Sequence, residues 1–390
     1  MRHTIAMLAL AAGIGAGAPA YAITGDQPEF RKLAEDVYAY IGKLNDANAM
    51  VIVTTEGVVL VDTGNNVTDT RELLAHVRSV TSQPVRYVVI TQNHNDHSGG
   101  AALVSPPATT IVHERVAKQW ATLKPHQITA WRRRFPERTS ALERLTPVDT
   151  VQSFSDRLTL RLGGKDIELI YVADQYNPGD IAVWLPKERI LHASMAGYKD
   201  RHPDIRPDYS HGTTDGLLKQ LKVYLTLRPA MVVPAHGPVG GGWLLETMIE
   251  YLLLARDSVQ EMMKKGLALP AIEKAFQMKA FGEWDRTEHL PWIAATIYRE
   301  LQGLGPQIIT VSERRQSGVV SSALQDGRFV TLTGADGTAV RLRVTGDTNF
   351  QGIGDRTAVR PGMKVSAVYE VPEGIVPALG YDTLELTIAP

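Results

Sequence analysis

Hydrophobic residues in the first part of the chain alternate between strand-like and helix-like spacing. Residues 37–64 contain three short runs rich in β-branched and aromatic residues, VYAYI, AMVIVTT and GVVLVDTG, separated by polar residues or glycine. Residues 68–80 change to a helical spacing that places Leu73, Leu74 and Val77 on one side. The run VRYVVITQN then predicts a strand that is buried on both faces. Strand, helix and strand in this order predict a layered α/β domain.

The same alternation continues to about residue 265. A strand is predicted at TTIVHE and a helix at residues 114–123, followed by a basic connection at residues 131–147. Four further strands are predicted at LTLRL, IELIYV, IAVWL and RILHAS. A helix at residues 215–227, a strand in MVVPAHG and a long amphipathic helix at residues 243–265 complete the series. Two sheets flanked by helices fit this pattern.

The pattern changes after residue 303. Residues 318–348 alternate apolar and polar positions at period two and contain Asp-Gly and Gly-Asp pairs that are typical of turns. This alternation predicts that Val340, Leu342 and Val344 face inward, whereas Arg341 and Arg343 face water. We expect a linker at residues 304–315 and a small all-β barrel or sandwich at residues 316–390. Such barrels can bind oligosaccharides or nucleic acid, although a solvated strand face explains the two arginines more simply.

The N-terminus has the features of a secretory signal peptide. Residues 1–22 combine Arg2, an apolar stretch and a small-residue cleavage site at Ala20-Tyr21-Ala22. The apolar stretch is shorter than the roughly 20 residues that a membrane-spanning helix needs. We therefore expect cleavage after Ala22 and a periplasmic or secreted protein that does not stay on the membrane. Residues 23–303 would form its first domain.

Composition restricts the chemistry that is available. The chain has no cysteine, so disulfides and thiolate ligands are excluded, and any metal must be bound by His, Asp, Glu, Gln or Tyr. Lys and Arg total 41 and Asp and Glu total 42, for a net charge of −1. This balance argues against a nucleic acid or an anionic membrane as partner. A small-molecule substrate fits better, and the sequence does not indicate the oligomeric state.

Two histidine-containing turns predict a metal site. In TQNHNDHSGG, His94, Asp96 and His97 follow an apolar strand and precede a glycine pair, and His236 follows another apolar strand in VVPAHGPVGG. Strand ends at one edge of a sheet are where α/β domains assemble their sites. Nitrogen and oxygen donors of this kind suit zinc. A single loop histidine usually binds nothing, but the cluster together with the second turn favours a metal site.

Four ordered segments over residues 37–265 resemble motifs of the metallo-β-lactamase superfamily. They are GVVLVDTG, NHNDHSGG, NPGDIAVWLPKERIL and VVPAHGP. The resemblance implies an αββα sandwich with the metal site at one edge. It also implies hydrolysis of an ester, lactone, lactam, amide or related bond by metal-bound hydroxide.

Three of the seven ligand positions that the resemblance implies are altered. The first histidine of the metal loop is matched by Gln92, the histidine before the Gly-Asp pair by Tyr176, and the bridging aspartate by Met195. The resemblance therefore implies that the first metal site keeps only Gln92 and His94 as weak ligands. The ligands of the second site are all present: Asp96, His97 and His236.

We therefore expect one zinc ion, bound by two imidazoles and a carboxylate with one position left for water. Asp96, His94 and Tyr176 are the candidate catalytic residues. His94 could accept the proton of the attacking water, and Tyr176 could donate a hydrogen bond to a developing oxyanion, but both side chains could equally fill space that a lost metal leaves.

Three other residues are candidates for supporting roles. His192 lies close to Met195 in the sequence, but three positions apart on a strand the two would face opposite sides, which argues against His192 as a substitute ligand. Asp62 and Asp180 are expected to orient the ligating imidazoles. The alternative hypothesis is a catalytically silent protein that uses the same fold to bind a ligand, because the bridging aspartate and a histidine of the first site are lost together.

Overall fold

The computed structural model describes most of the chain from residue 28 onward. The described residues are 28–42, 47–64, 67–92, 94–105, 107–118, 151–172, 179–198, 200–206, 213–304, 311–325, 327, 329–354, 356–372 and 380–388. The expected signal peptide at residues 1–22 and the candidate Tyr176 lie outside these ranges. Of the helix predicted at residues 114–123, residues 114–118 are described, and they are helical.

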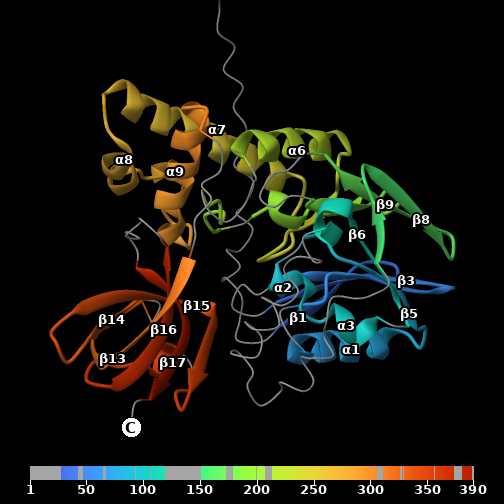
Figure 1. Cartoon of the computed structure of the whole chain (residues 1–390). Helices are drawn as coiled ribbons and strands as arrows, with labels where there is room; N and C mark the ends of the chain where they lie inside the picture. The colour runs from blue at the N-terminus through green and yellow to red at the C-terminus, as the bar shows by residue number, and fades with distance from the viewer. Residues whose placement is uncertain are drawn as a thin grey trace, which may run out of the picture.

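Two sheets form the centre of the first domain (Figure 1). The first sheet has seven strands in chain order, β1 (Glu29–Ala34), β2 (Val37–Ile41), β3 (Ala49–Thr54), β4 (Gly57–Val61), β5 (Val85–Val89), β6 (Thr109–His113) and β7 (Val151–Phe154). The second has the order β12-β11-β10-β9-β8, formed by β8 (Arg157–Leu162), β9 (Lys165–Tyr171), β10 (Ile181–Leu185), β11 (Ile190–His192) and β12 (Met231–Val233). Strands β1 and β7 were not predicted, and both lie at the edges of the first sheet.

Helices cover the outer face of each sheet. Helices α1 (Val67–Val80) and α3 (Ala101–Val104) cover the first sheet, and the short α2 (Asn95–Ser98) lies at the ends of its strands. Helices α6 (Thr214–Thr226) and α7 (Trp243–Lys264) cover the second sheet, and α8 (Leu269–Ala275) and α9 (Leu290–Leu301) pack against α7. Single 3-10 turns occur at η3 (Ser194–Ala196), η4 (Lys279–Phe281) and η5 (Thr287–His289). No helix within the described ranges combines the length and hydrophobicity that crossing a bilayer requires.

The alternation of side chains along the strands explains the layers. In β4, Val59 and Val61 point into the core between the two sheets, whereas Val58 and Leu60 pack with Leu73 of α1 on the outer side. A third cluster lies between the second sheet and helices α6, α7, α8 and α9. The result is the αββα sandwich that was expected, with a core on both faces of each sheet.

The C-terminal strands form a closed barrel in the order β13-β14-β15-β17-β16. Its strands are β13 (Val311–Leu324), β14 (Phe329–Thr333), β15 (Ala339–Gln351), β16 (Lys364–Pro372) and β17 (Tyr381–Ile388), with the 3-10 turn η6 (Arg356–Ala358) before β16. Val340, Leu342 and Val344 are buried in its core, as predicted. The structure therefore confirms an α/β sandwich followed by a small all-β unit.

Three details of the barrel differ from the prediction. Arg341 is exposed as expected, but the prediction for Arg343 is wrong, because it is 6% exposed and its guanidinium carbon lies 4.3 Å from the ring centroid of Trp292 on α9. The Gly346-Asp347 pair lies inside β15 and not in a turn. Strand β13 begins at Val311, so regular structure starts five residues before residue 316. Helix α9 covers a surface that the sequence pattern alone assigns to water.

Candidate metal centre

The metal loop follows β5 and turns at once into the four-residue helix α2. The carbonyl oxygen of His94 accepts hydrogen bonds from the backbone nitrogens of His97 and Ser98, at 3.1 and 3.0 Å. The hydroxyl of Ser98 donates to the same oxygen at 2.9 Å. This single turn places Asp96 and His97 at the carboxyl end of the first sheet, the edge at which the sequence predicted a site.

Asp62, which follows β4, fixes the orientation of His97. Its Oδ2 lies 2.7 Å from Nδ1 of His97, and both residues are fully buried. The same carboxylate accepts hydrogen bonds from the backbone nitrogen and the hydroxyl of Thr91, both at 2.8 Å. Nδ1 of His97 must therefore carry the proton, which leaves Nε2 as the atom available to a metal. Asp62 therefore has the hydrogen bond to His97 that its expected supporting role requires.

Asn48 holds the second histidine turn, and the sequence analysis did not identify it. Its side-chain nitrogen donates to the carbonyl oxygens of Pro234 and Gly237, at 2.9 and 2.7 Å, and its side-chain oxygen accepts from Gly42 at 3.1 Å. Its backbone nitrogen also donates to Ala235 at 2.7 Å. These bonds attach the turn that carries His236 to the start of β3. No local pattern marks Asn48, because its partners lie far away in the sequence.

The three expected ligands converge. Oδ2 of Asp96 lies 3.3 Å from Nε2 of His236 and 3.7 Å from Nε2 of His97. One donor atom from each residue lies within 4.8 Å of the others, and among the described residues these three form a group that could hold a metal ion. Tetrahedral zinc with ligand distances of about 2.1 Å separates its donors by roughly 3.4 Å. Nε2 of His97 is buried and has no hydrogen-bond partner in the part of the chain that the structure describes. The donor set therefore fits zinc.

The charges around this group favour a cation. Burial alone would lower the pKa of His97, but the carboxylates of Asp96 and Asp62 outweigh it and raise that pKa to about 9. For Asp96, burial opposes ionisation, but His97, His236 and His94 hold its pKa below the usual value. A proton and a metal ion thus compete for the same donors.

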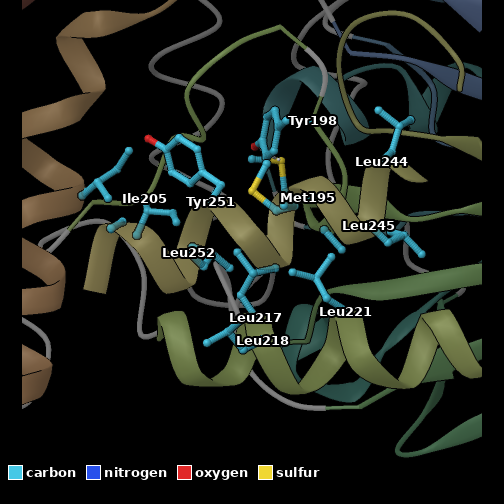
Figure 2. Close-up of a cluster of buried hydrophobic side chains, with 14 of the residues drawn as sticks. Met195, Tyr198, Ile205, Leu217, Leu218, Leu221, Leu244, Leu245, Tyr251 and Leu252 are labelled. Atoms are coloured by element: carbon cyan, nitrogen blue, oxygen red, sulfur yellow. Dashed lines mark hydrogen bonds between the residues drawn. The ribbon is translucent and has the colours of Figure 1, made fainter. Parts of the chain in front are cut away.

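Met195 lies in the turn η3 and not on a strand, so the strand argument against His192 was based on the wrong local structure. Met195 is buried with apolar neighbours, and the hydroxyl of Tyr198 donates to its sulfur at 3.1 Å, as Figure 2 shows. His192 is fully buried outside the metal-binding group, with Nε2 3.9 Å from Oδ2 of Asp62. Burial lowers the pKa of His192 to about 4, so it is neutral at neutral pH.

Tyr198 is a second residue that the sequence analysis missed. It is 1% exposed, and its ring lies nearly parallel to that of His236, with 6.5 Å between centroids. Burial raises the pKa of its hydroxyl above the usual value, so it is a neutral hydrogen-bond donor. The sequence could have indicated Tyr198 through its position. It lies three residues after Met195, and Met195 is the position at which the bridging aspartate was expected.

The remaining candidates lie around the group. Gln92 is buried, and His94 is half-buried. Burial lowers the pKa of His94, and His97 and Arg206 lower it further, against the opposing effect of Asp96 and Asp204. Asp180 is fully buried, and its charge acts on His97, in agreement with a supporting role.

Comparisons with known proteins agree with this geometry. The family model of the metallo-β-lactamase superfamily matches residues 42–236. A metallo-β-lactamase type 2 from Bacillus sp. (strain 170) is 28% identical over 211 residues, which cover 53% of this chain and 73% of that protein. A linear primary-alkylsulfatase from Pseudomonas sp. (strain ATCC 19151) is 24% identical over 242 residues, covering 54% of this chain and 44% of that protein.

A solved structure extends the likeness in fold. The stereoselective inverting sec-alkylsulfatase Pisa1 from Pseudomonas sp. superimposes with a TM-score of 0.55 at 16% sequence identity, covering 71% of this chain and 50% of that one. The family model spans half of this chain, from the first sheet to the turn of His236. The chain therefore belongs to the metallo-β-lactamase superfamily.

Proposed function

We propose that this protein is a secreted or periplasmic hydrolase that uses one zinc ion, held by Asp96, His97 and His236, to cleave an ester, lactone, lactam or amide in a small molecule. The observation that carries the proposal is the buried Nε2 of His97, which lacks a hydrogen-bond partner among the described residues and faces two other donors. Relatives named as β-lactamase and alkylsulfatase support hydrolysis as the reaction class.

The chain's own residues have distinct roles in this proposal. A zinc ion at this group would act as a Lewis acid and lower the pKa of a bound water to about 7. Asp62 and Asn48 keep the two imidazoles in position through the hydrogen bonds described above. His94, kept neutral by burial, is the candidate acceptor for the proton of the attacking water.

Tyr198 is the candidate donor to the oxygen that gains negative charge. Its hydroxyl is held by the sulfur of Met195, a weak acceptor, so exchanging this bond for one to an oxyanion is favourable. Tyr176 was predicted for this role and lies outside the described residues. Tyr198 therefore replaces it as the better supported candidate.

The competing function is a binding protein without catalysis. It is favoured by Met195, which is packed with apolar residues at the position of the expected bridging carboxylate. A single metal site does not need that carboxylate, because its three ligands come from other positions.

Metal content and turnover together test the proposal. The purified full chain is dialysed with trace zinc and analysed for metal, and it is assayed with chromogenic esters, lactones and a cephalosporin. We expect about one zinc per chain and hydrolysis of at least one of these substrate classes. Both the bound zinc and the hydrolysis should be lost in Asp96→Asn. Asp166→Asn, at a surface position 61% exposed, is the matched control. Two equivalents of zinc would refute the mononuclear site, and absence of retained metal would favour the binding protein.

A further inference from the structure

Arg201 is a buried arginine with two guanidinium nitrogens that lack an acceptor among the described residues. The residue is 6% exposed, and its Nε and Nη1 atoms are buried without a hydrogen-bond partner among the described residues. Its backbone is held firmly, since residues 201 and 285 form a β-bridge and the nitrogen of His202 donates to the carbonyl oxygen of Asp285 at 2.9 Å. Burying the donors of a charged group without acceptors is strongly unfavourable, so the two unsatisfied nitrogens of this fixed side chain require an explanation.

The neighbouring arginines differ from Arg201 in having carboxylate partners. Arg206 forms two hydrogen bonds with Asp204, at 2.7 and 3.1 Å. Arg286 lies 3.6 Å from Glu288. For Arg201, the contact that the structure shows is with an aromatic ring, since its guanidinium carbon lies 5.5 Å from the ring centroid of Tyr198. A contact of this kind compensates only part of the lost hydration.

Tyr198 connects Arg201 to the metal centre. Its ring packs against Arg201 and also lies beside the imidazole of His236, at the distances given above. One aromatic side chain therefore separates the guanidinium from the metal ligands.

We propose that Arg201 binds an anionic group of the substrate, a carboxylate or a similar oxyanion, while the metal centre cleaves a bond a few atoms away. A guanidinium offers several donors in a plane and binds oxyanions through charge-assisted hydrogen bonds. The substrate class is then a small ester, lactone or amide that carries an acidic group. This inference rests on the proposed function, because it names the substrate of that same site.

Two esters that differ by one carboxylate test the substrate preference. The full chain loaded with zinc is assayed with p-nitrophenyl butyrate and with mono-p-nitrophenyl succinate. We expect Arg201→Met to lower kcat/KM for the succinate ester by 10- to 100-fold, mainly through a higher KM. The same substitution should change kcat/KM for the butyrate ester by less than twofold. Arg201→Lys, which keeps the charge, should recover part of the loss. Arg161→Met, at an exposed surface position, should affect neither ester.

Equal losses on both esters in Arg201→Met and Arg201→Lys would overturn the inference, since a structural role affects both substrates alike. No loss on either ester would overturn it as well. Zinc content and circular dichroism of each variant show whether the fold is retained.

Binding of succinate separates this inference from the proposed function. Succinate is titrated into the zinc-loaded and zinc-free full chain, and thermal unfolding is followed, since a ligand of the native state raises Tm. We expect a rise in Tm for both forms of the wild type and none for Arg201→Met. If no ester is hydrolysed but this pattern holds, the proposed function fails and the anion site remains. If neutral esters are hydrolysed but succinate raises the Tm of the zinc-loaded form alone, the proposed hydrolase remains and the anion site is refuted.

Discussion

Replacing Asp62 with asparagine should weaken zinc binding without changing any ligand. Oδ2 of Asp62 accepts from Nδ1 of His97 and from the hydroxyl of Thr91, and Oδ1 accepts from the backbone of Thr91. An asparagine has one oxygen, so its amide nitrogen must face at least one of these donors. If it faces His97, the ring must carry its proton on Nε2, and that atom can no longer bind metal.

The hydrogen bonds that the amide cannot satisfy determine how much zinc affinity and folding stability Asp62→Asn should lose. Loss of a group that orients a ligating histidine typically costs 10- to 100-fold in metal affinity, or about 1.4–2.7 kcal/mol. In the other orientation the amide nitrogen faces the backbone N–H of Thr91, and this buried donor loses its acceptor at a cost of about 1–3 kcal/mol of folding stability. The neutral amide oxygen then also binds the imidazole of His97 less strongly than the carboxylate does. We therefore expect Asp62→Asn to bind zinc at least tenfold more weakly, and to unfold at lower denaturant concentration.

A competition titration with a chromophoric zinc chelator measures this affinity. Asp156→Asn, a substitution on the turn between β7 and β8, serves as the control for a lost carboxylate outside the site. If folded Asp62→Asn bound zinc with the wild-type affinity, the orientation of His97 by Asp62 would not matter, and the reasoning would be refuted.

Three further predictions concern residues around the site. Asn48→Ala should lower the free energy of unfolding by roughly 2–3 kcal/mol, because it removes three buried side-chain hydrogen bonds; denaturant titration measures this, and an unchanged midpoint would contradict it. Tyr198→Phe should reduce kcat about 10- to 100-fold with zinc content unchanged, because the lost hydroxyl acts in the transition state; an unchanged kcat would remove Tyr198 from catalysis. Burial lowers the pKa of His202, which is hydrogen-bonded to Tyr251, to about 4 from an unfolded value of 6.5. The unfolded chain therefore binds the additional proton first, and the metal-free protein should lose stability as pH falls from 6.5 towards 4. His202→Gln should reduce this slope in urea unfolding at a series of pH values, and an identical slope would contradict the assignment.

Much of the sandwich and the convergence of the candidate metal ligands could be predicted from the sequence. The strands of both sheets alternate or concentrate apolar residues because each sheet is buried, and this pattern is local. Asp96 and His97 share one short turn, and His236 follows an apolar strand, so their position at a sheet edge follows from the order of the elements. The loss of the expected bridging ligand at Met195 is also visible without a structure.

The tertiary structure decided how those residues are held and what surrounds them. Asn48 reaches the His236 turn across more than 180 positions, and Arg343 is buried because α9 of the first domain packs on the barrel. Met195 was assigned to a strand because the apolar run continues past β11, but the chain forms a 3-10 turn there and brings Tyr198 to the metal ligands. Two guanidinium nitrogens of Arg201 lack an acceptor among the described residues, and no local pattern in the sequence indicates this. Hydrophobic periodicity records which face of an element is buried, whereas hydrogen bonds and charge contacts between distant segments depend on where the whole chain places them.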